Sequence, residues 1–237
     1  MRTLFYCMLF FFSFPVAAQK TVDVTSGDVN AMNFFQVVGG QPITTTKFTK
    51  LVGGTPFFKD EWIKGDVVLN SGATHKTISL KLDLVDNEVR FLNERGEEFI
   101  ANNDIKEVVL NNALNNTNYR FMHSSTFSNV NGKKEGWYLW LHTGTASLYK
   151  HFQKSVIESK PYNSSTTEQT IQTKERYLVL YNNSFLEIKN IKDAPSVLAN
   201  KKSELEGFIK SKLNKEDSMD ERMTSLILYF NTLLSGQ

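Results

Sequence analysis

The four histidines are the side chains of this chain that most readily bind metals or move protons. They are His75, His123, His142 and His151. No two of them have the i, i+4 spacing of a helical zinc motif such as H-E-x-x-H. His142 and His151 lie on one predicted hairpin, where they meet only near its ends, and a zinc or copper site would still need further ligands. We therefore expect surface or turn histidines and assign no metal and no cofactor.

Other catalytic patterns are absent or misplaced. The chain has no G-x-S-x-G elbow and no P-loop. Ser147 and Lys150 match the S-x-x-K string of penicillin-binding enzymes, but they lie on a predicted strand, where residues three apart point to opposite faces. Asp60 and Glu61 also face opposite ways if the chain is extended there, so they cannot flank one glycosidic bond. We assign no catalytic residues.

The predicted hairpin of residues 136–152 carries the most distinctive surface. With Thr143-Gly144 as its turn, His142 pairs with Thr145, Trp140 with Ser147, and Tyr138 with Tyr149. Because side chains alternate along a strand, aliphatic residues then gather on one face and aromatic residues with polar tips on the other. The second face supplies the candidate ligand-binding residues, namely Tyr138, Trp140, His142, Tyr149 and His151.

Two interpretations of this aromatic face stay open. It forms a binding groove, as polar-tipped aromatic residues do in many ligand sites. Alternatively, the C-terminal helices cover it, because a helix pair must bury its apolar side somewhere.

The segments before this hairpin predict an antiparallel sheet of short strands. Residues 76–85 alternate cleanly, with Ile78, Leu80, Leu82 and Leu84 on one face. Tight turns separate them from their neighbours, which predicts a meander. The expected strands are residues 66–70, 76–85, 88–93, 97–101, 105–110, 119–123, 137–142, 145–152, 176–181 and 185–191. We expect a long surface loop over the polar residues 160–173.

The pattern becomes helical after Asp193. Asp193-Ala194-Pro195 predicts a helix start, because proline is favoured in the first turn. Ser218 and Glu221 match a capping box. Behind it, apolar residues repeat at three- and four-residue steps through residues 216–235. The sequence thus predicts two amphipathic C-terminal helices that pack on the sheet.

Composition and the first residues restrict location and partners. The chain has 237 residues, with 27 Lys and Arg against 25 Asp and Glu, so no basic excess favours nucleic acid. Residues 1–18 combine a positive start, an apolar stretch and small residues before Gln19, which predicts a secretory signal peptide. The single cysteine, Cys7, lies within that leader, so we expect a mature chain without disulfides. No other segment is apolar enough to span a membrane.

Several segments resemble a family of exported proteins of unknown function in Gram-negative envelopes. They are Gly54-Thr-Pro-Phe-Phe-Lys-Asp-Glu-Trp62, Gly65-Asp-Val-Val-Leu69, Lys160-Pro-Tyr162, Glu168-Gln-Thr-Ile171 and the closing pattern of residues 202–231. The resemblance implies export and a β-rich body with a helical tail. It transfers no activity and no site residue.

These patterns predict an α+β fold, with an antiparallel, curved β-sheet of short strands followed by two C-terminal amphipathic helices. The expected organisation is a signal peptide over 1–18, an irregular lead-in over 19–55, a β body over 56–192 and a helical segment over 193–237. We expect an exported, soluble, non-enzymatic protein, periplasmic, outer-membrane-associated or extracellular, that binds an unidentified envelope protein or small ligand. The alternatives are a carrier of an apolar lipid in the curved sheet and a hydrolase of envelope polymers.

Overall fold

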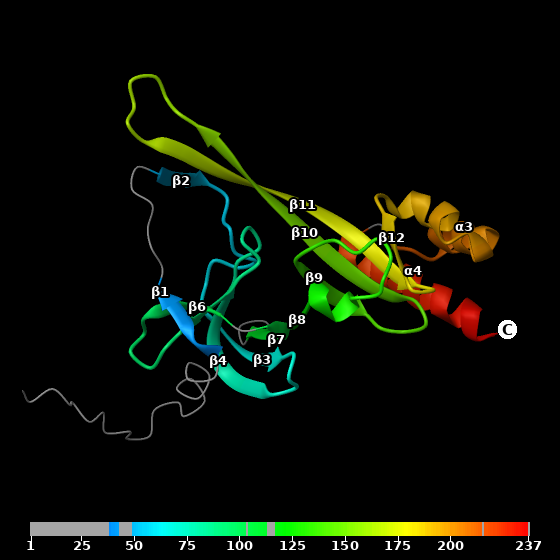
Figure 1. Cartoon of the computed structure of the whole chain (residues 1–237). Coiled ribbons are helices and arrows are strands. Elements are labelled where there is room, and N and C mark those ends of the chain that lie inside the picture. The colour runs from blue at the N-terminus through cyan, green and yellow to red at the C-terminus, as the bar shows by residue number, and fades with distance from the viewer. Residues whose placement is uncertain (1–37, 43–48, 103, 113–116, 215, 237) are drawn as a thin grey trace, which may run out of the picture.

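The computed structural model describes residues 38–42, 49–102, 104–112, 117–214 and 216–236. Nearly half of these residues form one sheet that is largely antiparallel, and helices follow it at the C-terminal end (Figure 1). This agrees with the predicted order of a β body and a helical tail. The predicted signal peptide of residues 1–18 lies outside the described residues.

The sheet contains twelve strands. In chain order they are β1 (Gly40–Pro42), β2 (Thr49–Gly53), β3 (Ile63–Leu69), β4 (Thr74–Leu82), β5 (Val89–Leu92), β6 (Glu98–Ala101), β7 (Ile105–Asn112), β8 (Thr117–His123), β9 (Trp137–His142), β10 (Ser147–Ser159), β11 (Thr167–Tyr181) and β12 (Ser184–Ile188).

The expected meander is present as β3, β4, β5 and β6, each antiparallel to the next. The strand β7 then returns to the other edge of β3, so the sheet grows in both directions from β3. The full order is β1-β6-β5-β4-β3-β7-β8-β9-β10-β11-β12, with β2 added beside β11, and the sheet does not close on itself.

The lead-in expected to be irregular over residues 19–55 contributes two strands in its described part. The strand β1 is antiparallel to β6, and β2 is parallel to β11. Both are short and are held by partners far along the chain. Local sequence patterns do not report such long-range pairing.

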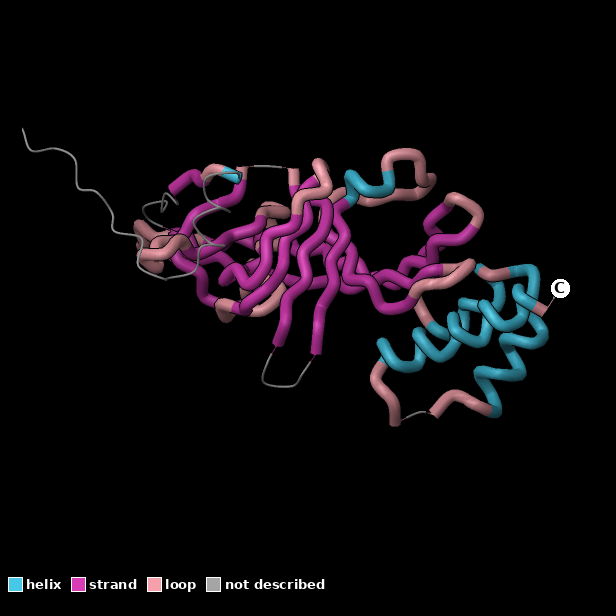
Figure 2. The backbone as a smooth tube through the Cα atoms, turned by 90° about the horizontal axis from the view of Figure 1, so that it is seen from below, coloured by secondary structure: helices cyan, strands magenta, loops and turns pink. Residues whose placement is uncertain are grey.

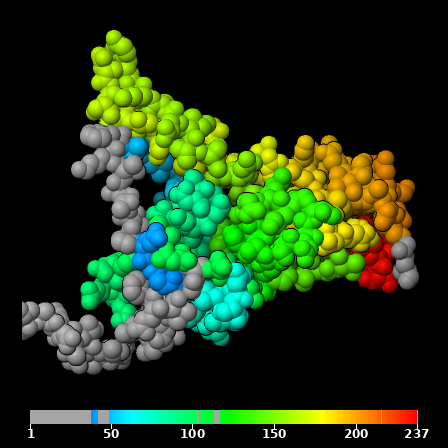
Figure 3. Space-filling view, in the orientation of Figure 1, coloured from blue at the N-terminus to red at the C-terminus, as the bar shows by residue number. Residues whose placement is uncertain are grey.

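The loop expected over residues 160–173 is confirmed for residues 160–166 and wrong for residues 167–173, which belong to β11. The pairing of β10 with β11 continues from Ser147 and Leu180 to Ser159 and Glu168 without interruption. The end of this hairpin, residues 156–171, projects from the body as an arm (Figures 1 and 3). A solvated strand can be polar on both faces, and threonine is favoured in strands, so polar composition misled the loop prediction.

The helices of the C-terminal segment follow one another in the predicted order, but their first and last residues differ from the prediction. It contains the 3-10 turns η2 (Ile191–Asp193) and η3 (Ala199–Lys201) and the helices α2 (Ala194–Val197), α3 (Lys202–Ser211) and α4 (Met219–Ser235). The Ser218–Glu221 capping box is present, and α4 therefore begins at Met219 rather than at 216. The Asp193 side chain makes no capping bond. The helices gather at one end of the sheet (Figure 2).

Two hydrophobic cores lie along one face of the central strands. The β core contains Leu139 together with apolar residues of β3, β4, β5, β7 and β8. The helix core contains Leu148 with Leu226 and Phe230 of α4, and Leu141 contacts both cores. Because Leu139 and Leu141 are two residues apart on β9, the two cores share one side of the sheet.

Candidate functional site

The β9–β10 hairpin has a different register from the predicted one. Trp140 pairs with Tyr149 and Tyr138 with His151, a shift of two residues on β10. The reason lies in the connection, which spans residues 143–146 instead of two turn residues. Asn231 of α4 fixes it by accepting a hydrogen bond from Ala146 N at 2.7 Å and donating one to Ala146 O at 2.9 Å. A shift of two keeps Tyr138, Trp140, Tyr149 and His151 on their predicted face. At His142 a bulge adds a further residue, so that His142 pairs with Leu148 rather than with Thr145.

The aromatic face of this hairpin is packed rather than open. Tyr138, Tyr149 and Phe127 form a buried cluster with Leu178 and Phe185. Ring centroids lie 5.1 Å apart for Phe127 and Tyr138 and 5.4 Å apart for Phe127 and Tyr149. Three of these aromatic rings thus contact one another in the interior.

The cover of this face comes from residues 124–136, which begin with η1 (Ser124–Phe127), and not from the C-terminal helices. The Tyr138 hydroxyl donates to Lys134 O at 2.7 Å and accepts from Lys134 N at 2.6 Å. His151 Nε2 lies 2.9 Å from Glu135 O. Of the two interpretations left open for this face, cover by the C-terminal helices was wrong, because α4 packs on the opposite face, against Ala146 and Leu148.

Burial sets the electrostatics of the same cluster. It raises the pKa of Tyr138 to about 12 and outweighs the hydrogen bond from the backbone of Lys134, which acts in the other direction. Burial also lowers the pKa of His151 from 6.5. Tyr138, Tyr149 and His151 are therefore interior side chains of this fold.

Trp140 is half-buried at the margin of the cluster, and His142 is half-buried near the end of β9. The guanidinium carbon of Arg120 lies 4.2 Å from the Trp140 ring centroid, and Trp140 stacks on Tyr149 at 6.2 Å. Neither residue lines either of the two cavities described next. Their role in ligand binding stays a prediction.

A cavity of about 460 Å³ opens on the other face of the sheet, between the two cores. Its floor consists of Leu139 and alternate residues of β10, and Asp220 in the first turn of α4 borders it. We call this cavity the lysine cleft. It is lined by Phe58, Lys59, Leu84, Tyr119, Leu139, Lys150, Phe152, Lys154, Thr173, Glu175 and Asp220.

The strap of residues 55–59 forms one wall of the lysine cleft, and backbone bonds fix it to the end of β4. Phe58 N donates to Leu82 O, and Leu84 N donates to Pro56 O, both at 2.9 Å. The Phe58 ring then packs edge-on against Tyr119 at 5.0 Å and Phe152 at 5.5 Å. An aromatic wall is thereby held in place before any ligand arrives.

Lys150 is the buried cation at the floor of the lysine cleft. Its Nζ lies 2.8 Å from Glu175 Oε2 and 3.0 Å from Asp220 Oδ1. The Tyr177 hydroxyl donates to the same Asp220 oxygen at 2.5 Å. Burial and this bond raise the pKa of Tyr177. The network joins the start of α4 to β10 and β11 and stabilises the cleft floor.

The other two lysines of the cleft have no such carboxylate partner. Lys154 Nζ donates to Thr55 O and Phe57 O, each at 2.7 Å, and burial lowers its pKa. The Nζ of Lys59 lies 5.7 Å from the Phe58 ring centroid and 5.8 Å from that of Tyr119. Among the residues that the structure describes, neither ammonium forms an ion pair with a carboxylate.

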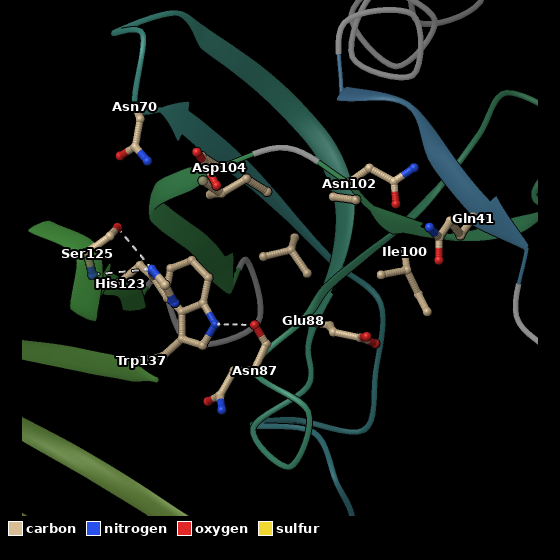
Figure 4. Close-up of a pocket in the computed structure, with 13 residues that line it drawn as sticks. Gln41, Asn70, Asn87, Glu88, Ile100, Asn102, Asp104, His123, Ser125 and Trp137 are labelled. Atoms are coloured by element: carbon tan, nitrogen blue, oxygen red, sulfur yellow. Dashed lines mark hydrogen bonds between the residues drawn. The ribbon is translucent and has the colours of Figure 1, made fainter. Parts of the chain in front are cut away.

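A second cavity, of about 360 Å³, is polar and lies near the start of β7 (Figure 4). Its wall carries four amide side chains, those of Gln41, Asn70, Asn87 and Asn102, with the carboxylates of Glu88 and Asp104. His123 lines it too, and burial lowers the pKa of this imidazole. Burial, aided by the Asp86 charge, raises the pKa of Glu88.

The titratable groups of this polar cavity do not converge. His123 is the N-cap of η1: its Nδ1 accepts a hydrogen bond from Ser125 N at 3.4 Å and lies 3.0 Å from Ser125 Oγ. In Figure 4, Glu88 and His123 lie apart, with Trp137 and Asn87 between them. His123 therefore has a structural role at the start of η1. It is not placed with Glu88 as a general acid or base.

The remaining chemical candidates have structural partners. Ser147 Oγ donates to Gly144 O, whereas Lys150 reaches Asp220, so the S-x-x-K pair does not form a catalytic unit. Asp60 pairs with Lys81 at 3.0 Å. No group of three His, Asp or Glu side chains within the described ranges is arranged to hold a metal ion. None of the described helices has the length and apolar character needed to cross a bilayer.

Sequence reasoning missed the lysine cleft, although part of its signal was present. Lys150, Phe152 and Lys154 alternate on β10 and therefore share a face, which interleaves cations with an aromatic ring. Phe58 lies 94 residues before Phe152, and Asp220 lies 66 residues after Lys154. Only the folded chain brings these segments together.

Comparison with known proteins adds no relative. The chain matches no protein-family model, no curated protein and no solved structure. The resemblance to exported envelope proteins therefore remains a prediction from the sequence, and any function must be argued from the site itself.

Proposed function

We propose that this is an exported, non-enzymatic binding protein that holds a small ligand in the lysine cleft. Export rests on the sequence pattern of residues 1–18. Binding rests on one observation, which is the position of the cleft between the β core and the helix core on the same face of the sheet. Its volume of about 460 Å³ suits a small molecule.

The prearranged walls support ligand binding. Phe58 is fixed by backbone bonds of its strap, and Lys150 is fixed by Glu175 and Asp220. Groups that are already ordered lose little conformational entropy when a ligand arrives. The cleft is therefore suited to recognition without rearrangement.

The titratable groups of the cleft already bind other groups of the protein, and this supports a non-enzymatic role. Lys150, Glu175 and Asp220 are bound to one another, and Lys154 is bound to two carbonyl groups. A general base or nucleophile must be within reach of substrate and must be able to exchange its partner. The hydrolase alternative would instead draw on the polar cavity, where Glu88 and His123 lie apart (Figure 4).

The lipid-carrier alternative fits the cleft less well. It depends on the curved sheet predicted from the sequence and on an apolar lining. A wholly apolar ligand would remove water from Lys59 and Lys154 without supplying a hydrogen-bond acceptor, which is costly for a charged group.

A blocking substitution tests the proposal. Thr173 is exposed and lines the cleft, so Thr173→Trp should fill part of it without disturbing a core. Two fluorescent probes, anilinonaphthalene sulfonate and phenylnaphthylamine, are titrated into the purified protein. We expect at least one probe to bind the unchanged protein and to lose most of its affinity for Thr173→Trp.

The neighbouring Gln172→Trp is the matched control. Gln172 is also exposed, and it points to the other face of β11 because side chains alternate. It should leave probe binding unchanged. Failure of both probes to bind, or equal affinity for the two tryptophan variants, would contradict binding in the lysine cleft.

A further inference from the structure

We propose that the ligand of the lysine cleft is an amphipathic anion, with one anionic group and an aromatic or alkyl body. This inference rests on the proposed function and adds the chemical class of the ligand. It follows from the separate arrangement of charge and apolar surface within one cavity.

The charges of the lining leave a positive excess. Three lysines, Lys59, Lys150 and Lys154, face two carboxylates, those of Glu175 and Asp220. Lys150 holds both carboxylates, at 2.8 and 3.0 Å. No acid in the lining offsets the formal charges of Lys59 and Lys154. The nearby Asp83 carboxylate, which lies outside the lining, acts on Lys154 but is itself paired with Arg90 at 2.7 Å.

Lys154 is the stronger determinant of the two. Its Nζ donates two hydrogen bonds to the neutral carbonyls of Thr55 and Phe57, which satisfy donors without cancelling charge. An ammonium has three donors, so one N–H remains for a ligand oxygen. A hydrogen bond between two charged groups is shorter and stronger than one between neutral groups.

The apolar half of the cleft is aromatic. Phe58 contacts Tyr119 and Phe152 edge-on, and all three rings are half-buried and line the cavity. Leu84 and Leu139 add aliphatic surface below them. A ligand body that covers these rings removes apolar surface from water, which favours binding.

A ligand that matches only the lysines, or only the aromatic rings, does not fit the whole lining. An inorganic anion such as phosphate would satisfy the lysines but leave the aromatic wall in water. A neutral apolar molecule would cover the rings but bury the Lys154 charge without an acceptor. One molecule that carries both features satisfies both walls at once.

The two probes of the blocking experiment form a matched pair for this inference. Phenylnaphthylamine is anilinonaphthalene sulfonate without its sulfonate, so the ratio of their affinities isolates the charge. We expect the sulfonate to bind at least about tenfold more tightly, because one strong charged contact corresponds to that factor. The ratio should fall as salt rises, since salt screens charges near the surface.

Lysine variants identify the charges that are responsible. Lys59→Met should weaken sulfonate binding by about threefold to fivefold, as expected for an exposed cation, and leave phenylnaphthylamine unchanged. The matched control is Lys174→Met, because Lys174 lies between the cleft residues Thr173 and Glu175 on β11 and points to the opposite face. Lys154→Arg keeps the charge and should retain the preference for the sulfonate.

Competition distinguishes the possible ligand sources. Displacement of the bound sulfonate by naphthoate supports an aromatic acid, and displacement by decanoate supports an alkyl acid or a lipid of that chemistry. Displacement by inorganic phosphate as effectively as by either acid overturns the amphipathic assignment. Equal affinity for the two probes overturns the anionic assignment but leaves the proposed function intact, whereas no binding of either probe overturns the proposed function itself.

Discussion

Two leucines of α4 provide a test of how the helical tail is attached to the sheet. Leu226 is fully buried in the helix core, whereas Leu228, two residues later, is 52% exposed. Leu226→Ala removes buried carbons and leaves a cavity, which costs roughly 2–5 kcal/mol. Leu228→Ala removes exposed carbons and should cost well under about 1 kcal/mol.

The pair is matched because both substitutions change leucine to alanine in the same helix. Any effect of helix propensity is therefore shared, and the difference between the variants reports burial. A loss of about 3 kcal/mol should lower the unfolding temperature by roughly 6–12 °C in a domain of this size. Urea and thermal unfolding followed by circular dichroism would measure both quantities.

Equal destabilisation by the two substitutions would refute the packing described for α4. It would mean that the stripe of Met223, Leu226, Ile227 and Phe230 is not the side of the helix that faces the sheet. The predicted amphipathic character of this helix would then fail as well.

Two further predictions concern the β9–β10 hairpin and its cover. Asn231→Ala removes both side-chain bonds to Ala146 and leaves its backbone unpaired, so urea unfolding should show a loss of about 1–3 kcal/mol, and Asn231→Asp, which keeps only an acceptor, should recover part of it. Because burial lowers the pKa of His151 below the value of 6.5 expected in the unfolded chain, the unfolded state binds the proton more readily, and stability should fall as pH drops below about 6.5. His151→Gln should make the free energy of unfolding less dependent on pH between about 7.5 and 5.5, and an unchanged slope would count against a buried, neutral imidazole.

Local patterns predicted the elements of this fold better than their connections. The alternation of residues 76–85 and the Ser218–Glu221 capping box correctly indicated β4 and the start of α4. Both signals depend on neighbours within a few residues. The register of the β9–β10 hairpin depends instead on Asn231, which lies 85 residues beyond Ala146, and it was predicted wrongly by two residues.

The candidate site shows the same limit. Alternation placed Tyr138, Tyr149 and His151 on one face correctly, but it carried no information about residues 124–136, which cover that face. For the opposite face of the hairpin, alternation predicted an aliphatic core and no cavity. The lysine cleft is lined by Phe58 of the strap, by residues of β10 and by Asp220 in the first turn of α4, so it depends on the packing of distant segments and not on any one segment.

The most direct test of binding in the lysine cleft is a crystal structure of the protein with anilinonaphthalene sulfonate. We predict density for the ring system against Phe58 and Phe152, with the sulfonate within hydrogen-bond distance of Lys154 Nζ. Density for the probe at the exposed Val156 and Ile157 of the arm, or beside Trp140, with an empty lysine cleft would contradict it.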